Sequence, residues 1–282
     1  MRKPFYLVGA LVVLARAAEA QSVGKMLEED FSHAAKDMIA VWASPFDATG
    51  KDWLIAAGSL GAFGLAMFAD QSVSDWAIRN EGSDFFDALK PVRRNGVLFT
   101  GKYVIPPILG VYVLGIAFKN QDMRDFVTGC MASWGAQQTV RRLTTWTFGR
   151  ARPDTTDSPE VFPNDPQIWK LGGGWGNWNM RSFPAGHFSN LVSCATYWNH
   201  RFRLGAAGPV LYAVAAAVGM GRTADDAHWF SDHVIGGILG YAVGREIAHR
   251  SLRRARGLPH APVFGVAPSA EGGISVNLSW TF

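Results

Sequence analysis

A histidine and an aspartate stand four residues apart at His228 and Asp232, a spacing that can build an activated nucleophile. Residues four apart share one face of a helix, so the Asp232 carboxylate can accept a hydrogen bond from one ring nitrogen of His228. The other ring nitrogen is then unprotonated and can attack an electrophile. Arg222 precedes the pair on an expected loop, and its planar guanidinium can bind two phosphate oxygens. Two more aspartates and another histidine lie close by, so a turn of solvated charges is the alternative.

A second cluster is the segment from Ser182 to His187, which leads into an apolar stretch and predicts the start of a helix. Pro184 suits a first helical turn, and Gly186 lets the backbone approach a ligand. The unpaired N–H groups of a helix start bind anions, and a histidine at this position can protonate a leaving oxygen. An ordinary capped helix start, without a ligand, is the alternative.

A third cluster is Gly149-Arg150-Ala151-Arg152-Pro153. Pro153 is expected to end a helix, which leaves two guanidinium groups near the helix C-terminus. Taken alone this cluster is weak support for a site, because arginines at a helix C-terminus interact favourably with the helix dipole and need no ligand.

Together the three clusters resemble the signature of the type 2 phosphatidic acid phosphatase and vanadium haloperoxidase superfamily. That signature is Lys, six residues and Arg-Pro; then Pro-Ser-Gly-His; then Ser-Arg, five residues, His, three residues and Asp. The corresponding segments of this chain are Thr145–Pro153, Pro184–His187 and Gly221–Asp232. Their order and internal spacing match, and the resemblance covers about residues 120 to 250.

The resemblance implies a role for three residues in a two-step phosphoryl transfer. His228 would attack phosphorus and form a phosphohistidine, and Asp232 would orient it. His187 would protonate the leaving group and later activate water.

The resemblance also implies a phosphate-binding set formed by Arg152, Arg222 and the segment of Ala185 and Gly186, with the Gly186 backbone N–H as a donor. The developing charge would be met by guanidinium groups and oriented amides. No metal and no cofactor are therefore expected, and vanadate is expected to inhibit.

Three positions depart from the family signature. Thr145 stands where the family has Lys, Ala185 replaces Ser, and Gly221 replaces the other Ser. Loss of one charge-assisted contact costs ~2 to 3 kcal/mol, which would slow such an enzyme without abolishing its chemistry. Three arginines could fill the vacated space: Arg141, Arg142 and Arg150.

The elements that must position these residues are predicted to be helices. Met26 to Trp42 has apolar residues near helical spacing and predicts an amphipathic helix. Six more helices are expected at Trp53–Phe68, Gly96–Phe118, Asp122–Phe148, His187–Arg201, Ala207–Met220 and Ser231–Arg254. The fold class is thus all-α, a helical bundle of the phosphatidic acid phosphatase type 2 and haloperoxidase kind.

Two segments do not follow this helical pattern. Pro153 to Ser182 has no periodicity and contains three tryptophans, so it is expected to be either a rim beside the pocket or a surface loop that patches the core. At the end of the chain, Pro262–Pro268 and Ile274–Phe282 flank a turn and predict a short β-hairpin.

The first twenty residues read as a secretory signal. Arg2 and Lys3 precede an apolar run, and Ala18-Glu19-Ala20 provides small residues at a cleavage site. The expected organisation is a signal peptide (1–20), an amphipathic helix with linker (21–52), a phosphatase bundle (53–257) and a hairpin (258–282). Cys130 and Cys194 are either buried free thiols or a disulfide, which an oxidising compartment permits.

Charge and hydropathy limit the partners. The net charge is formally +4, and the basic residues are not interleaved with aromatics, so nucleic acid is not expected. Several apolar stretches are slightly shorter than the ~20 residues of a membrane span. The chain is therefore expected to be exported to the periplasm or cell envelope and to contact a membrane surface, by peripheral or integral attachment.

These observations leave three functions open. The first is a phosphatase that acts on a phosphate ester, a lipid phosphate or a polyprenyl diphosphate. The second is a vanadium-dependent haloperoxidase that would use His228 as the vanadate ligand. The third is a non-catalytic envelope protein that kept the fold and lost parts of the pocket.

Overall fold

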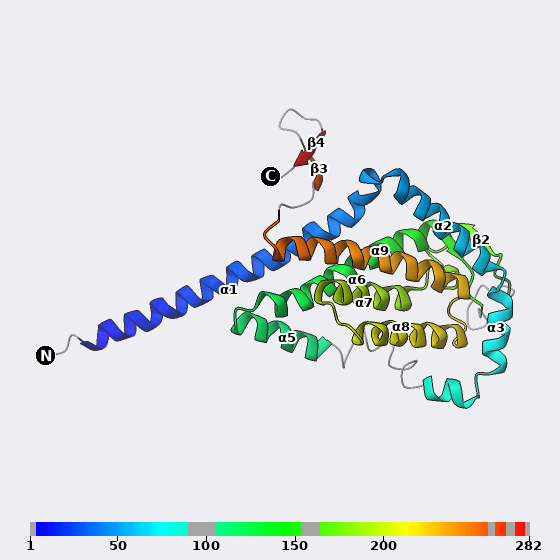
Figure 1. The fold of residues 1–282 in the computed structure, drawn as a ribbon, viewed down its shortest axis with the longest axis horizontal. Coiled ribbons are helices and arrows are strands. Elements are labelled where there is room, and N and C mark those ends of the chain that lie inside the picture. The colour runs from blue at the N-terminus through cyan, green and yellow to red at the C-terminus, as the bar shows by residue number, and fades with distance from the viewer. Residues whose placement is uncertain (1–3, 90–104, 154–163, 259–262, 269–273, 280–282) are drawn as a thin grey trace.

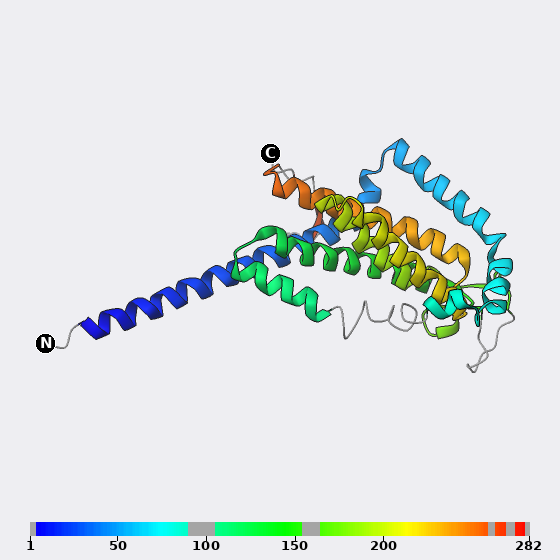
Figure 2. The ribbon, with the colours of Figure 1, turned by 60° about the horizontal axis from the view of Figure 1, so that its bottom comes forward.

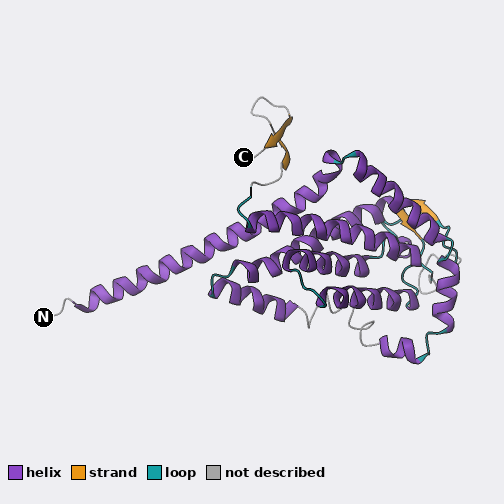
Figure 3. Ribbon diagram, in the orientation of Figure 1, coloured by secondary structure: helices purple, strands orange, loops and turns teal. Residues whose placement is uncertain are grey.

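The computed structural model describes residues 4–89, 105–153, 164–258, 263–268 and 274–279. Most of this part of the chain is helical (Figure 3). The helices are α1 (Pro4–Ala43), α2 (Gly50–Met67), α3 (Asp70–Arg79), α5 (Ile105–Ala117), α6 (Gln121–Thr147), α7 (Gly186–Phe202), α8 (Ala207–Ala224) and α9 (Phe230–Ala255). Short 3-10 helices lie at η1 (Ser44–Asp47) and η3 (Trp178–Met180), and residues 84–89 are also helical. The all-α prediction is confirmed.

Helices α6, α7 and α9 form the centre of the bundle, and α2 and α3 wrap one of its ends (Figures 1 and 2). The main core contains Ala136 of α6, Tyr197 of α7 and Ile247 of α9, each fully buried. Burial of such side chains drives the packing, at roughly 25 cal/mol per Å² of apolar surface.

Glycines on α9 allow α7 to approach closely. A Cβ atom added at Gly240 would lie 2.4 Å from the Ser189 carbonyl oxygen, and one added at Gly244 would lie 2.2 Å from that of Ser193. Both distances are far below a van der Waals contact, so only glycine permits this separation of the two helix backbones. His187 is the second residue of α7, and His228 lies in the loop two residues before α9, so this packing sets their spacing.

A disulfide bond joins Cys130 of α6 to Cys194 of α7. The sequence was compatible with either a disulfide or two buried free thiols, and the structure shows the disulfide. The bond closes a loop with a sequence separation of 64, for which the chain-entropy model gives about 4 kcal/mol of stabilisation.

Buried ion pairs fasten the second half of α1 to the bundle. The Asp30 carboxylate accepts a hydrogen bond from Nε of Arg124 in α6, with 2.9 Å between the two atoms. Asp37 accepts from Arg250 and Arg254 of α9 at 3.0 and 2.6 Å. The predicted amphipathic helix at 26–42 is therefore present, but it is part of a longer helix that begins at Pro4 and extends away from the bundle (Figure 1).

Five of the predicted bundle helices occur close to their expected bounds, and the sixth is seen in part. Of Gly96–Phe118, the structure describes a helix from Ile105, and residues 96–104 lie outside the described residues. Helix α3 was not predicted, because Asp70–Arg79 is short and its mean hydropathy is low.

The expected helix end at Pro153 is wrong. Helix α6 ends at Thr147, and the next residues form β1 (Phe148–Arg150), which pairs antiparallel with β2 (Trp169–Leu171). This strand pair turns the chain after α6. Arg150 is the last residue of β1, and Arg152 follows it outside the strand. The C-terminal hairpin consists of β3 (Val263–Pro268) and β4 (Ile274–Ser279), with Val263 opposite Ser279.

Among the residues that the structure describes, no helix is by itself long and apolar enough to cross a bilayer. Helices α2 and α3 meet the length and composition criteria only when taken together, and a bend of 51° separates them.

Candidate active site

All three signature clusters meet at one cavity of about 250 Å³. The end of α6, the start of α7, the end of α8 and the loop before α9 contribute to its wall. Seven of its lining side chains are arginine or histidine: Arg141, Arg142, Arg152, Arg181, Arg222, His187 and His228. Within the described residues no aspartate or glutamate lines it. A cavity with this lining favours a multiply charged anion.

His228 lies in the loop between α8 and α9 and is only 4% exposed. Its Nδ1 lies 2.6 Å from the carbonyl oxygen of Ser182. A carbonyl can only accept, so Nδ1 carries the proton and Nε2 is left with a free lone pair. Burial, followed by the charge of Arg152, holds the pKa of His228 well below its usual value, which keeps the ring neutral and nucleophilic.

Asp232 does not perform the expected contact with His228. Its side chain accepts from Arg150 at 2.6 Å, from the Trp229 backbone N–H at 3.0 Å and from the Ser182 hydroxyl. The prediction failed because the four-residue rule requires both residues on one helix, and α9 begins only at Phe230. Asp232 instead acts on His228 indirectly. It accepts a hydrogen bond from the Ser182 hydroxyl, and the Ser182 carbonyl orients the His228 ring.

His187 is the second residue of α7 and lines the same cavity. Burial, with the charges of Arg222, Arg141 and Arg152, lowers the pKa of His187 to about 4. The imidazole is therefore neutral near pH 7. An anionic ligand would offset the three guanidinium charges and raise this pKa.

Arg152 and Arg222 each present a buried Nε–H that has no hydrogen-bond partner in the described part of the chain. A buried donor without an acceptor costs about 1 to 3 kcal/mol, so these groups indicate an absent acceptor. Burial and the neighbouring Arg222 lower the pKa of Arg152 to about 10, which still leaves it charged at neutral pH. Arg152 also stacks on Trp178 at 4.6 Å. Arg222 lies in the last turn of α8, not on a loop as expected.

The start of α7 adds backbone donors to this cavity. Ala185 is the N-cap, and the Ser189 N–H is the first to bond back to the carbonyl of Ala185. The N–H groups of Gly186, His187 and Phe188 have no partner among the described residues, as is usual for a first helical turn. Gly186 and His187 line the cavity, where such groups bind anions.

One residue of the expected phosphate-binding set, Ala185, and one of the auxiliary candidates, Arg150, do not line the cavity. The N–H of Ala185 donates to the backbone oxygen of Asp232 at 3.1 Å, so it is not available to a ligand. Arg150 is fully buried behind the cavity, where carboxylates, a hydroxyl and a carbonyl accept from its guanidinium. The proposal that Arg150 replaces the family lysine is therefore wrong.

Arg141 and Arg142 do line the cavity, one turn before Thr145. A Cβ atom at Gly186 would lie 2.6 Å from Cδ of Arg141, so the glycine makes room for this arginine beside the start of α7. The Thr145 hydroxyl donates to the Phe183 carbonyl at 2.8 Å. Thr145 thus fastens the loop before α7, and Arg141 adds a cation to the lining of the cavity.

Sequence reasoning assigned no site role to four residues of the lining: Gln138, Trp146, Arg181 and Asn190. Trp178 belongs to the aperiodic segment and lies at the cavity rim, 62% exposed, which agrees with the rim interpretation of that segment. Trp175 contacts Trp146 in a tilted arrangement, with 4.5 Å between the ring centroids. Arg181 donates to the Gly174 carbonyl at 2.9 Å. Trp178 and Arg181 have no spacing signal, because a long loop brings them to the site, whereas Asn190 lies on α7 one turn after Gly186.

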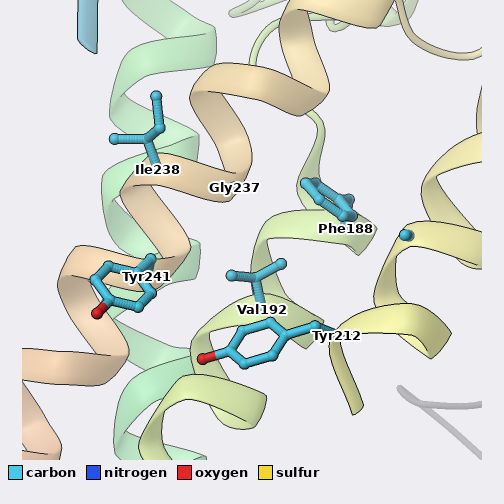
Figure 4. Close-up of a pocket in the computed structure, with 7 residues that line it drawn as sticks. Phe188, Val192, Tyr212, Gly237, Ile238 and Tyr241 are labelled. Atoms are coloured by element: carbon cyan, nitrogen blue, oxygen red, sulfur yellow. The ribbon is translucent and has the colours of Figure 1, made fainter. Parts of the chain in front are cut away.

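A second cavity, of about 360 Å³, lies between α7, α8 and α9 and is almost wholly apolar (Figure 4). Its lining includes Phe188, Val192, Tyr212 and Tyr241. Among its described lining residues there is none of the arginines and histidines of the first cavity. Phe188 contacts His233, whose ring in turn contacts His228 at 5.7 Å between centroids.

Comparison with known families gives one match. Residues 126–256 match the family model of the PAP2 superfamily. This range contains all three signature clusters, helices α7 to α9, and α6 from Phe126 onward. No curated protein and no solved structure shows a significant match to the chain.

Proposed function

Because residues 126–256 make this chain a member of the PAP2 superfamily, whose members are generally phosphatases, we propose that it hydrolyses a phosphate ester through a phosphohistidine on His228. The observation that carries the proposal is the set of unpartnered donors around the free Nε2 of His228. Arg152 and Arg222, whose buried Nε–H groups have no partner among the described residues, line one cavity together with the first residues of α7. A phosphoryl group would satisfy these donors.

In the first step Nε2 of His228 forms a bond to phosphorus and the bond from phosphorus to the ester oxygen breaks. His187 gives its proton to that oxygen, so an alcohol leaves. The imidazole becomes cationic, and the Ser182 carbonyl stabilises its Nδ1–H. Arg152 and Arg222 meet the negative charge of the phosphoryl oxygens.

In the second step water attacks the phosphohistidine. His187, now neutral, accepts a proton from the water, and the bond between phosphorus and Nε2 breaks. Inorganic phosphate leaves, and His228 returns to its Nδ1-protonated form. Vanadate, which imitates the five-coordinate phosphorus, is expected to inhibit by occupying this cavity.

A lipid phosphate or diphosphate is the proposed substrate class, and a membrane surface is the proposed location. Helix α2 supports this proposal, because apolar side chains along it are exposed: Trp53, Leu54, Ile55, Leu60, Leu65 and Phe68. Phe63 of the same helix contacts Phe183 at 5.3 Å, so this apolar surface lies beside the loop that carries the site. The signal-like residues 1–20 and the disulfide support export, since disulfides persist in oxidising compartments.

Covalent labelling tests the proposal. A substrate with labelled phosphorus should transfer an acid-labile, base-stable label to the wild-type chain, and His228→Ala should neither take the label nor turn over. His249→Ala is the matched control, because His249 is an exposed histidine of α9 outside the cavity. Turnover by His228→Ala at the wild-type rate would contradict the mechanism, and absence of hydrolysis by the wild type on lipid and soluble phosphates would contradict the function.

A further inference from the structure

A network of fully buried charges lies behind the catalytic cavity. Asp70 at the start of α3, Arg150 of β1 and Asp232 of α9 are each 0% exposed. Arg150 bridges the two carboxylates, with 2.6 Å from one terminal nitrogen to Asp70 and 2.6 Å from the other to Asp232. The three residues come from distant parts of the chain, and Asp70 lies outside the PAP2 match.

The surroundings of Arg150 hold its guanidinium in one orientation. Its Nε and one terminal nitrogen also donate to the Pro166 carbonyl at 3.1 and 2.9 Å, and the other terminal nitrogen donates to the Ser231 hydroxyl at 2.8 Å. The guanidinium carbon lies 4.8 Å from the centre of the Trp169 ring. Five donor contacts and a stacked ring leave the side chain little freedom to rotate.

From this geometry, and resting on the proposed function, we propose that Asp70 and Arg150 are positioning residues for the His228 nucleophile. They act through Asp232, whose first carboxylate oxygen Arg150 occupies. The second oxygen is thereby kept for the Ser182 hydroxyl and the Trp229 N–H. Ser182 then presents its carbonyl to Nδ1 of His228 and fixes the tautomer whose Nε2 faces the cavity.

Asp70 is the outermost member of this chain of contacts. Besides Arg150, it accepts from the Ser231 backbone N–H and from the Ser231 hydroxyl, both at 2.7 Å. Ser231 is adjacent to Asp232, so Asp70 holds both the arginine and the first turn of α9. The segment of α2 and α3 therefore completes a site whose reacting groups all belong to the PAP2 region.

Asp70→Asn keeps the shape of the side chain and removes its charge. Arg150 then has Asp232 as its remaining carboxylate partner in the network. The guanidinium is expected to attract both oxygens of Asp232 in a two-pronged contact. Ser182 and Trp229 would lose their shared acceptor, and the carbonyl that orients His228 would shift. Misplacement of a reacting group by about 1 Å lowers rates on the order of 100-fold.

The first measurement is steady-state kinetics with a soluble aryl phosphate. We expect Asp70→Asn to lower kcat on the order of 100-fold with little change in KM, because the phosphate-binding arginines are not altered. Ser74→Ala is the matched control, since Ser74 is also a fully buried residue of α3 and its hydroxyl has no partner in the described structure. Ser74→Ala should keep the wild-type kcat.

The second measurement does not depend on activity. Nitrogen-15 NMR of labelled histidine distinguishes a ring protonated on Nδ1 from one protonated on Nε2, and the His228 signals can be assigned with His228→Ala. We expect the Nδ1-protonated form in the wild type and in Ser74→Ala, and a mixture of both forms in Asp70→Asn. A role confined to stability would lower Tm and leave this spectrum unchanged.

Ser231→Ala is a second variant, which keeps the charges of Asp70 and Arg150 and removes only the hydroxyl that contacts both. It should change kcat and the spectrum in the same direction as Asp70→Asn, but to a smaller extent. An unchanged spectrum and kcat in a folded Asp70→Asn or Ser231→Ala would overturn the positioning role, while covalent labelling of the wild type would still support the phosphatase. If the wild type shows the Nδ1 form and Asp70→Asn loses it, positioning stands even where no substrate is turned over.

Discussion

At the residue scale, His187 has a pKa that conflicts with its proposed role. A general acid must carry a proton, yet burial, followed by the charges of three arginines, lowers the pKa of His187 to about 4. Bound phosphate brings negative charge beside the ring and raises this pKa. The proton is then held only when a phosphate occupies the cavity, which limits the acid function to the complex.

This coupling predicts a pH signature. The rate constant kcat reports the complex and kcat/KM reports the free enzyme, so the loss of activity on the alkaline side of the His187 pKa should occur at higher pH in kcat. The measurement is the ratio of rates for an alkyl and an aryl phosphate, because only the alkyl leaving group needs the proton. Ionisation of the phosphate itself largely cancels in this ratio.

His187→Ala should remove this pH dependence and reduce turnover of the alkyl phosphate much more than that of the aryl phosphate. Equal losses on both substrates would mean that His187 only shapes the cavity.

Motif spacing predicted which residues meet but not how they bond. His228, His187, Arg152 and Arg222 were correctly brought to one cavity, because the order and spacing of the clusters carry that information. The partner of Arg150 could not be predicted, since Asp70 lies 80 residues earlier in the chain. The carbonyl that orients His228 could not be predicted either, because every residue has a backbone carbonyl and the sequence does not mark the one that is used.

At the element scale, apolar periodicity located the central helices, which are long and bury one face. It failed for α3, where ten residues of low mean hydropathy form a helix that is held by Asp70 and by contacts with α8 and α9. It failed also at β1, since three residues are too few to show a period. Both failures concern short elements whose conformation is set by tertiary contacts.

The close packing of α7 against α9 gives a prediction at this scale. Gly240→Ala places a methyl group 2.4 Å from the Ser189 carbonyl oxygen, so the helices must separate. Overpacking of this kind costs about 1 to 3 kcal/mol, and Tm should fall by several degrees. Activity should fall as well, because these helices set the spacing of His187 and His228.

Gly58→Ala is the control for this experiment, since Gly58 is exposed on α2 and a Cβ there meets no atom within 4 Å. In a helix interior this change favours folding by up to about 1 kcal/mol. A Tm for Gly240→Ala equal to or above that of the wild type would show that α7 and α9 can accommodate a methyl group at this position and that glycine is not required there.

At the scale of the whole molecule, cationic and apolar surfaces lie close to one another. The arginine-lined cavity opens near Trp178, and the loop before α7 contacts α2 through Phe63 and Phe183. The exposed side of α2 bears large apolar groups, among them Leu54 at 74% and Leu65 at 73% exposure. An amphiphile with an anionic head and an apolar tail matches this arrangement, as does the surface of a bilayer that contains it.

The last prediction follows from this arrangement and separates membrane contact from catalysis. Leu54→Glu together with Leu65→Glu should weaken sedimentation with vesicles of an anionic lipid. Each leucine contributes ~1.5 to 3 kcal/mol when fully buried, so the apparent affinity should fall at least about 10-fold. Turnover of a soluble aryl phosphate should stay at the wild-type level, because neither residue touches the cavity, whereas turnover of a lipid phosphate in the vesicles should fall. Leu258→Glu, an exposed leucine beyond α9, controls for added charge and should bind like the wild type. If the double variant binds vesicles as well as this control does, α2 is not the membrane-contact surface, and its apolar side chains require a protein partner instead.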